Sequence, residues 1–133
     1  MAKWKRMADF WIDLPDRPGE LARLAARLRA ADVNLLGLWG YGAQDGHARF
    51  YCVPESPEQF RNFAQSAELN TREGVTFYLC AADQGGSLVQ TLEHIAKAGI
   101  NLLAIQAVSI QGEFGCFLWA NAEDWPELAK VLS

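Results

Sequence analysis

Apolar and polar positions follow one another in an order that predicts the same series of strands and helices twice. The segments Asp9–Leu14 and Val75–Ala82 are rich in aromatic and β-branched residues, which is typical of strands. A turn follows each segment, and then leucine and isoleucine residues recur at helical spacing. We expect these side chains to face a core: Leu21, Leu24 and Leu28 in the first half, and Leu88, Leu92 and Ile95 in the second.

Each half continues with a predicted β-hairpin and a second helix. Apolar runs that begin at Val33 and Ile100 predict second strands, and turns at residues 43–46 and 111–113 lead into third strands. The third strands are expected over His47–Val53 and Phe114–Ala120, and the second helices over Pro57–Ala67 and Asp124–Leu132. Their inward residues are expected to be Phe60, Phe63 and Ala64, and Trp125, Leu128 and Leu132.

The elements repeat because the sequence itself repeats. Asp16–Asn34 aligns with Asp83–Asn101 at an offset of 67 residues, and the same offset pairs Phe10 with Phe77 and Phe50 with Phe117 without a gap. A repeat of this length in a chain of 133 residues indicates one supersecondary unit used twice. We therefore expect a first domain over residues 1–72 and a second over residues 73–133.

The order of elements predicts an α+β protein made of two tandem ferredoxin-like βαββαβ sandwiches. Glu68–Arg72 can supply the last strand of the first copy, whereas the second copy lacks a clear last strand. This would leave a sheet edge beside Val75–Ala82, and such edges are normally paired or covered. The N-terminal segment, the partner copy or another chain is expected to cover it.

Charge and cysteine content narrow the range of partners. The formal net charge is −4, and Lys3, Lys5 and Arg6 form the only basic cluster, which argues against nucleic acid or an anionic membrane as a partner. No apolar run approaches a membrane span and no secretion signal is evident, so a cytoplasmic location is expected. The three cysteines lie far apart within apolar stretches, which predicts buried, reduced thiols.

Motifs for catalysis are missing from the sequence. It contains no Gly-x-Ser-x-Gly, no phosphate-binding glycine loop with lysine and no His-Glu-x-x-His. His47 and His94 have no cysteine or carboxylate at metal-binding spacing. Asp9 and Asp13 fall on one face of a strand, but nothing in the sequence supplies the cleft that acid–base chemistry needs. We therefore expect a protein that is not an enzyme and that has no cofactor or metal.

A resemblance to a known family rests on the turn that leads into the first helix and on the end of that helix. The chain reads Asp16-x-Pro18-Gly19-x-Leu21 and then Ala31-x-Val33-Asn34-Leu35, and the second ending recurs as Ala98-Gly99-Ile100-Asn101-Leu102. This pattern resembles the ACT domain, the amino-acid-sensing module of metabolic enzymes. Because the similarity covers nearly the whole chain, the sequence looks like a stand-alone tandem ACT protein. The second copy departs from the pattern, with Gly85-Gly86 where the first has Pro18-Gly19.

The resemblance implies a ligand site as well as the ferredoxin-like fold. ACT pairs usually bind an amino acid at their interface, held by the loop that leads into the first helix and by the start of the second strand. The corresponding residues here are Asp16, Gly19, Glu20, Leu21 and Asn34, and Gln84, Gly86, Ser87, Leu88 and Asn101. The first turn of a helix has N–H groups that suit a carboxylate, and asparagine offers both a donor and an acceptor. The implied partners are an amino acid or similar small ligand and a partner enzyme under allosteric control. A homodimer is expected for a different reason, because an open sheet edge and apolar strands leave surface to cover.

Structural explanations remain open beside this one. The glycines and asparagines also suit turns, and Asp16 (or Asp13) and Asp83 suit helix caps better than ligand contacts. Trp39, on the predicted second strand, is a candidate interface residue. The alternative function is a protein–protein interaction or oligomerisation module that binds no ligand, and a third is a small enzyme that would depend on a cysteine.

Overall fold

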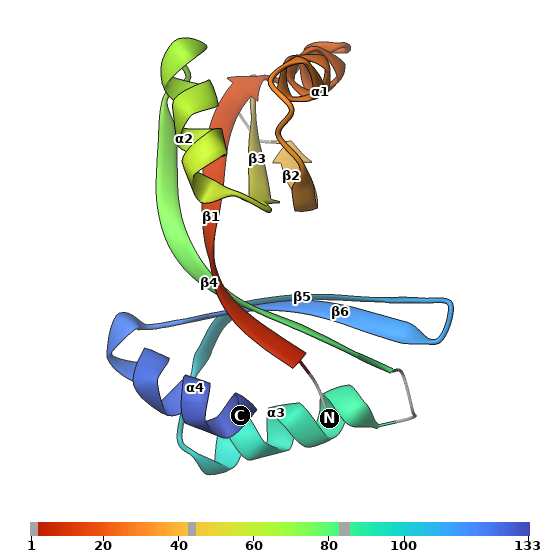
Figure 1. Ribbon diagram of the computed structural model, residues 1–133, viewed down its shortest axis with the longest axis vertical. Helices are drawn as coiled ribbons and strands as arrows, with labels where there is room; N and C mark the ends of the chain where they lie inside the picture. Colours follow the sequence, from red (N-terminus) through yellow and green to blue (C-terminus); the bar gives the residue numbers. More distant parts are fainter. Residues whose placement is uncertain (1–2, 43–44, 83–85) are drawn as a thin grey trace. The chain divides into compact units, whose positions relative to one another are not determined.

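The structure is a computed structural model, and it describes residues 3–42, 45–82 and 86–133. The chain forms the elements β1 (Lys3–Pro15), α1 (Glu20–Ala30), β2 (Leu35–Gly42), β3 (His47–Pro54), α2 (Pro57–Ser66), β4 (Thr71–Ala82), α3 (Ser87–Lys97), β5 (Leu102–Ile110), β6 (Glu113–Ala120) and α4 (Trp125–Leu132), as Figure 1 shows. A 3₁₀ turn, Ala122–Asp124, precedes α4. This order confirms the predicted α+β class with ferredoxin-like, ACT-like units. Part of the predicted turn at residues 43–46 lies outside the described residues, as do Asp83, Gln84 and Gly85.

The chain divides into two compact units that share two strands. The first unit is Ala8–Gly74, and the second unit combines the residues up to Met7 with Val75–Ser133. β1 therefore begins in the second unit and ends in the first, whereas β4 begins in the first and ends in the second. The strand order is β2-β3-β1-β4 in the first unit and β1-β4-β6-β5 in the second, so that each unit has four strands.

The core of the first unit lies between its sheet and helices α1 and α2. Phe10 and Ile12 of β1 and Cys52 of β3 contribute the sheet side of the core, and Phe10 pairs with Cys52 in the antiparallel register. The helices contribute Leu24, Leu28, Phe60, Phe63 and Ala64, as predicted. Leu21 does not join them, because its side chain is 39% exposed; its assignment to the core was wrong.

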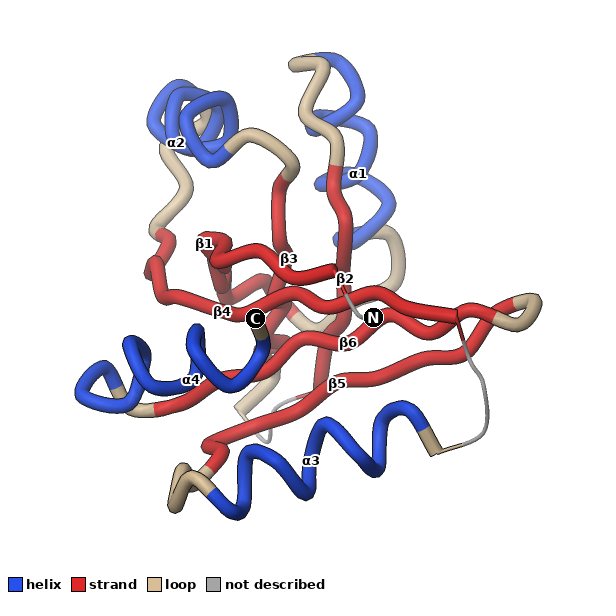
Figure 2. Tube along the Cα trace, turned by 60° about the horizontal axis from the view of Figure 1, so that its bottom comes forward, coloured by secondary structure: helices blue, strands red, loops and turns tan. Residues whose placement is uncertain are grey.

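In the second unit, α3 and α4 lie on one face of the sheet (Figures 1 and 2). Phe77, Leu79, Cys116 and Leu118 form the sheet side of this core. Ile95 and Leu128 are its buried helical residues, and the predicted Leu88, Leu92, Trp125 and Leu132 are half-buried against it.

The N-terminal segment covers the sheet edge that the second copy leaves open. Lys3–Met7 of β1 belongs to the second unit, where β1 is the neighbour of β4. Trp4 packs against the core with its ring centroid 5.9 Å from that of Phe77. The Arg6 guanidinium lies 4.6 Å from the ring centre of Trp125. Of the three ways in which this edge could be covered, the chain uses its own first strand.

The two halves repeat in backbone detail as well as in element order. Gly19 and Gly86 precede α1 and α3 with φ values of 91° and 90°, a left-handed conformation that favours glycine. At the helix ends, Val33 N–H donates to the Leu28 carbonyl at 2.9 Å, and Ile100 N–H donates to the Ile95 carbonyl at 3.3 Å. A register irregularity follows at equivalent positions of β2 and β5. The two halves therefore share backbone conformation at equivalent positions as well as sequence.

The gap-free alignment of the third strands was wrong. Phe50 pairs with Ile12, whose side chain is in the core, whereas Phe117 pairs with Tyr78 on the opposite face of its sheet. Cys52 pairs with Phe10 and Leu118 pairs with Phe77, so the offset falls from 67 to 66 residues after the hairpin. A shift of one residue exchanges the two faces of a strand, and the aligned phenylalanines are therefore not equivalent.

Shortening the Trp4 side chain tests the role of the N-terminal strand. We expect Trp4→Ala to lower the free energy of unfolding by roughly 2 kcal/mol, because a half-buried aromatic side chain leaves the core. Amide hydrogen exchange in Val75–Ala82 should also accelerate. Lys5→Ala, at an exposed position of the same strand, is the control and should change neither quantity. Equal stability of the Trp4 variant and the wild type in urea would contradict this role.

Candidate functional site

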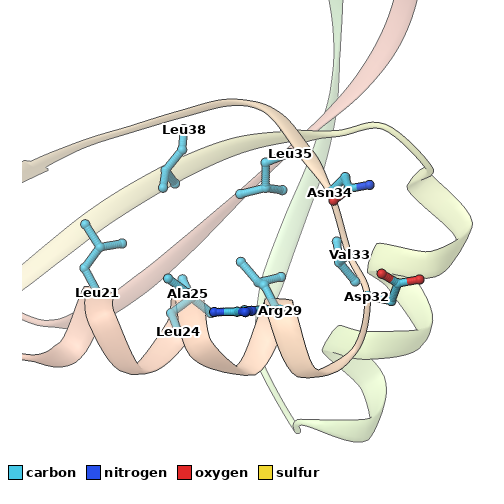
Figure 3. A pocket seen from close by; sticks show the side chains of 10 residues that line it. Leu21, Leu24, Ala25, Arg29, Asp32, Val33, Asn34, Leu35 and Leu38 are labelled. Carbon is cyan, nitrogen blue, oxygen red and sulfur yellow. The ribbon is translucent and has the colours of Figure 1, made fainter.

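A groove in the first unit runs between α1 and β2. Its volume is about 210 Å³. It is lined by Leu21, Leu24, Ala25, Leu28, Arg29, Asp32, Val33, Asn34, Leu35 and Leu38 (Figure 3). The groove is thus formed by the face of α1 that carries Leu24 and Leu28, by the turn after this helix and by the first half of β2.

The walls of the groove are mainly hydrocarbon. In Figure 3, Leu21 of α1 and Leu38 of β2 point toward each other across it, and Leu35 lies beside them. The side chains of Leu21 and Leu38 are 39% and 42% exposed, so these walls are open to a ligand or to another surface. Exposed leucines that face each other across a groove can bind an apolar group.

Polar and charged groups lie toward the end of the groove at which α1 finishes. Arg29 provides a cation, Asp32 an anion, and Asn34 an amide that can both donate and accept hydrogen bonds. Asp32 adopts the left-handed conformation with φ 58°, which ends the helix. The Asn34 carbonyl accepts a 2.9 Å hydrogen bond from the Glu55 N–H, so the backbone that carries this amide is held in place.

Of the predicted site residues in the first unit, two line this groove and three do not. Leu21 and Asn34 line it, and Asp16, Gly19 and Glu20 lie outside its lining. Glu20 is largely buried and forms an ion pair with Arg17 at 2.7 Å. The sequence analysis missed Arg29 and Asp32. Charged residues are common at the ends of helices, so their positions alone did not indicate a site.

The predicted caps of α1, Asp16 or Asp13, were wrong. No described side chain caps α1, and its N-cap residue is Gly19. The Asp16 N–H instead donates to the Gly46 carbonyl at 2.8 Å, which fixes the turn beside the β2–β3 hairpin. The Asp13 carboxylate accepts a hydrogen bond from Arg49 Nε at 3.1 Å on the neighbouring strand. Asp83, the third predicted cap, lies outside the described residues.

The predicted site residues of the second unit are dispersed. Gly86 is the N-cap residue of α3, and the Ser87 hydroxyl lies 3.5 Å from the Ala82 carbonyl, to which it can donate. Leu88 packs against the core, and Asn101 is exposed. Gln84 lies outside the described residues. Ser87 lines a cavity that is different from the groove described above.

The thiols of the two buried cysteines are poor nucleophiles. Burial and the nearby Asp9 carboxylate raise the pKa of Cys52 to about 12, and burial raises the pKa of Cys116 to about 11. Both thiols therefore stay protonated at neutral pH. Cys80 is half-buried, so the prediction of buried thiols is confirmed at two of the three positions.

Metal and membrane sites are not evident in the part of the chain that the structure describes. Within residues 3–42, 45–82 and 86–133, no group of three or more His, Cys, Asp and Glu side chains could hold a metal ion. None of the helices described there has the length and apolar character needed to cross a membrane.

Comparison with known proteins identifies the fold. The sequence matches no known family profile, and no curated protein is significantly similar to it. Among solved structures, protein BT0572 from Bacteroides thetaiotaomicron is similar with a TM-score of 0.83 and 13% identity, over 97% of this chain and 88% of that one. The regulatory subunit of aspartate kinase from Thermus thermophilus is similar with a TM-score of 0.68 and 10% identity, over 98% and 93% of the two chains. The corresponding subunit from Thermus flavus gives 0.59 and 11%, over 99% and 93%.

These similarities extend over almost the whole of each chain. The protein therefore shares its fold with these regulatory subunits of aspartate kinase over nearly its whole length. The resemblance to tandem ACT proteins that the sequence pattern carries is supported at the level of the fold.

The buried thiols predict how stability depends on pH. Since the folded pKa values of Cys52 and Cys116 lie above the ordinary value of 9.0, the folded state binds protons more tightly than the unfolded state. The contribution of the two thiols to the free energy of unfolding should be constant below pH 9. Between pH 9 and about pH 11, it should fall by about 1.4 kcal/mol per pH unit for each thiol. Urea denaturation at several pH values measures the slope, which should be shallower in Cys52→Ala. The same slope in the variant and the wild type would contradict the assignment.

Proposed function

We propose that this chain is a non-enzymatic regulatory protein that binds an amino acid in the groove between α1 and β2. The observation that carries the proposal is the pairing of an open hydrocarbon wall with a cation, an anion and an amide in one groove. The fold that it shares with regulatory subunits of aspartate kinase agrees with the proposal. The regulated partner would be an enzyme or another protein whose affinity changes when the ligand binds.

The groove has the chemistry that an amino acid requires. A zwitterion carries a carboxylate and an ammonium group, and Arg29 and Asp32 could pair with one each. Asn34 could bind either group. The leucine walls would contact the side chain of the ligand, which favours an apolar amino acid. The involvement of Asp16, Gly19, Glu20 and the second-unit residues, and the completion of the site by a second ACT-like copy, stay predictions.

Thermal denaturation in the presence of each of the twenty amino acids tests this proposal. At 100 times its dissociation constant, a ligand should raise the free energy of unfolding by about 2.7 kcal/mol for one site. We expect the rise with apolar amino acids, and we expect Arg29→Gln to remove most of it because the carboxylate loses its cation. Arg23→Gln is the matched control, since Arg23 is an exposed residue of the same helix that does not line the groove.

If no amino acid stabilises the protein, the amino-acid proposal is wrong. The interaction module that binds no ligand is then favoured. Equal stabilisation of the Arg29 variant and the wild type would instead place the amino acid elsewhere than in this groove.

We also propose that the protein forms a homodimer through its edge strands. β2 and β5 are the last strands in the strand orders of the two units, and both carry exposed apolar side chains. These side chains are Leu36, Leu38 and Tyr41 on β2, and Leu103, Ile105, Val108 and Ile110 on β5. Exposed, apolar edge strands are normally covered by another chain. Trp39 also lies on β2, where its ring stacks on Tyr51 at 5.9 Å, and its role at an interface stays a prediction.

Equivalent substitutions in the two edge strands test the dimer. We expect Leu36→Lys or Leu103→Lys to lower the mass in sedimentation equilibrium, because a lysine on an edge strand opposes pairing. Val89→Lys changes an equally exposed apolar residue on α3 and should leave the mass unchanged. A wild-type protein of monomeric mass would rule the dimer out, and a dimer that withstands both edge substitutions would place the interface elsewhere.

A further inference from the structure

The second unit contains a cavity that is larger than the groove between α1 and β2 of the first unit. Its volume is about 520 Å³, which is within the range of small-molecule sites. It is bounded by α3, by the end of α4, by the last residues of β4 and by the start of β6. All of its lining residues belong to the second unit.

One side of the cavity is polar and the other is hydrocarbon. Ser87, Gln90, Thr91 and His94 recur at intervals of three and four residues, so they project from one face of α3. Leu79 and Phe114, from the sheet, and Leu132, from α4, supply apolar surface. α3 turns Leu88, Leu92 and Ile95 toward the core, and Gln90 and His94 are exposed. The half-buried Ser87 and Thr91 are therefore the polar residues that require an explanation.

The equivalent space in the first unit is filled. Because α1 and α3 align at an offset of 67 residues from N-cap to C-cap, Thr91 corresponds to Leu24 and His94 to Arg27. Leu24 is only 4% exposed and packs in the core. Arg27 extends further and donates a 3.2 Å hydrogen bond to the carbonyl of Ala67, at the end of α2. The smaller residues of the second unit leave the hollow open.

The hydroxyl groups of the cavity are oriented by the backbone. Thr91 Oγ1 donates to the Ser87 carbonyl at 3.1 Å, and the Ser87 hydroxyl can donate to the Ala82 carbonyl at 3.5 Å. With these protons engaged, both oxygens present lone pairs as acceptors, whereas the Gln90 amide can donate or accept. The polar side therefore suits a molecule that carries both donors and acceptors.

We propose that this cavity binds a small uncharged molecule, with its hydrogen-bonding groups against α3 and its hydrocarbon side against Leu79 and Phe114. Among the residues that the structure describes, no Lys, Arg, Asp or Glu side chain lines the cavity, so a ligand with a fixed charge would find no side chain of those four types to pair with. This separates the cavity from the groove of the first unit, which offers both a cation and an anion. The chain then has two ligand sites of different chemistry on one repeated scaffold.

Saturation-transfer NMR with four neutral probes tests the proposal: valeramide, 2-pyrrolidinone, 1,2-hexanediol and glucose. We expect valeramide and 1,2-hexanediol, which have a polar end and a hydrocarbon side, to bind more tightly than glucose. Thr91→Leu, which introduces the residue type of the first unit, should weaken their binding at least tenfold because it fills the hollow. His94→Arg should do the same by closing the space toward α4, which provides a second test if the first variant does not fold.

Two matched controls locate the binding. Val89→Leu enlarges an exposed residue of the same helix outside the cavity and should leave probe binding unchanged, as should Arg29→Gln in the groove of the first unit. The proposal is wrong if no probe binds to the wild-type protein or if binding persists in both folded cavity variants. The amino-acid site proposed for the first unit is tested separately. If amino acids still stabilise the Thr91→Leu variant, the proposed function holds whether or not the cavity binds a probe.

Discussion

The sharing of β1 and β4 between the two units is the constraint on which the rest of the structure depends. In the second unit, residues of Val75–Ser133 form the three neighbouring strands β4, β6 and β5. Lys3–Met7 provides the fourth, and Trp4 packs beside Phe77 in the core. The first unit in turn takes its fourth strand from the start of β4, where Gly74 is so close to Asp9 that a Cβ atom would lie 2.9 Å from the carboxylate. The second unit is thereby completed by residues distant in sequence, whereas the first unit is one continuous segment.

Strong local signals allowed much of this fold to be predicted. Turn residues and apolar spacing located the helices, and the left-handed glycines at positions 19 and 86 mark where α1 and α3 begin. The assignment of the N-terminal segment remained one of three alternatives, because strand pairing across some 70 residues leaves no local pattern. The register of the third strands failed for a different reason. A hairpin that is shorter by one residue exchanges the faces of a strand while the sequence similarity scarcely changes.

The candidate site was less predictable than the fold. The family resemblance indicated which positions could bind a ligand, and two of them, Leu21 and Asn34, line one groove. Glu20 instead forms an ion pair with Arg17, and Leu88 packs against the core. Arg29 and Asp32 are close in sequence, but that they line one groove with Leu35 and Leu38 becomes visible only when α1 and β2 are placed in space. The cavity beside Thr91 lies where the second unit has a smaller side chain than the first unit. It was recognised by comparison with Leu24, the equivalent residue, which packs in the core of the first unit.

The place of Lys3–Met7 also affects the order in which the protein can fold during synthesis. These residues are made before the first unit, yet the strand beside which they lie, Val75–Ala82, is made only after the whole of that unit. The nascent first unit can bury its own core while this segment stays unpaired, so the second unit cannot be completed before a loop of about 70 residues closes. Closure of so long a loop is a slow, non-local step, and the first strand is consequently the part of the chain most exposed to pairing with the wrong neighbour before synthesis ends.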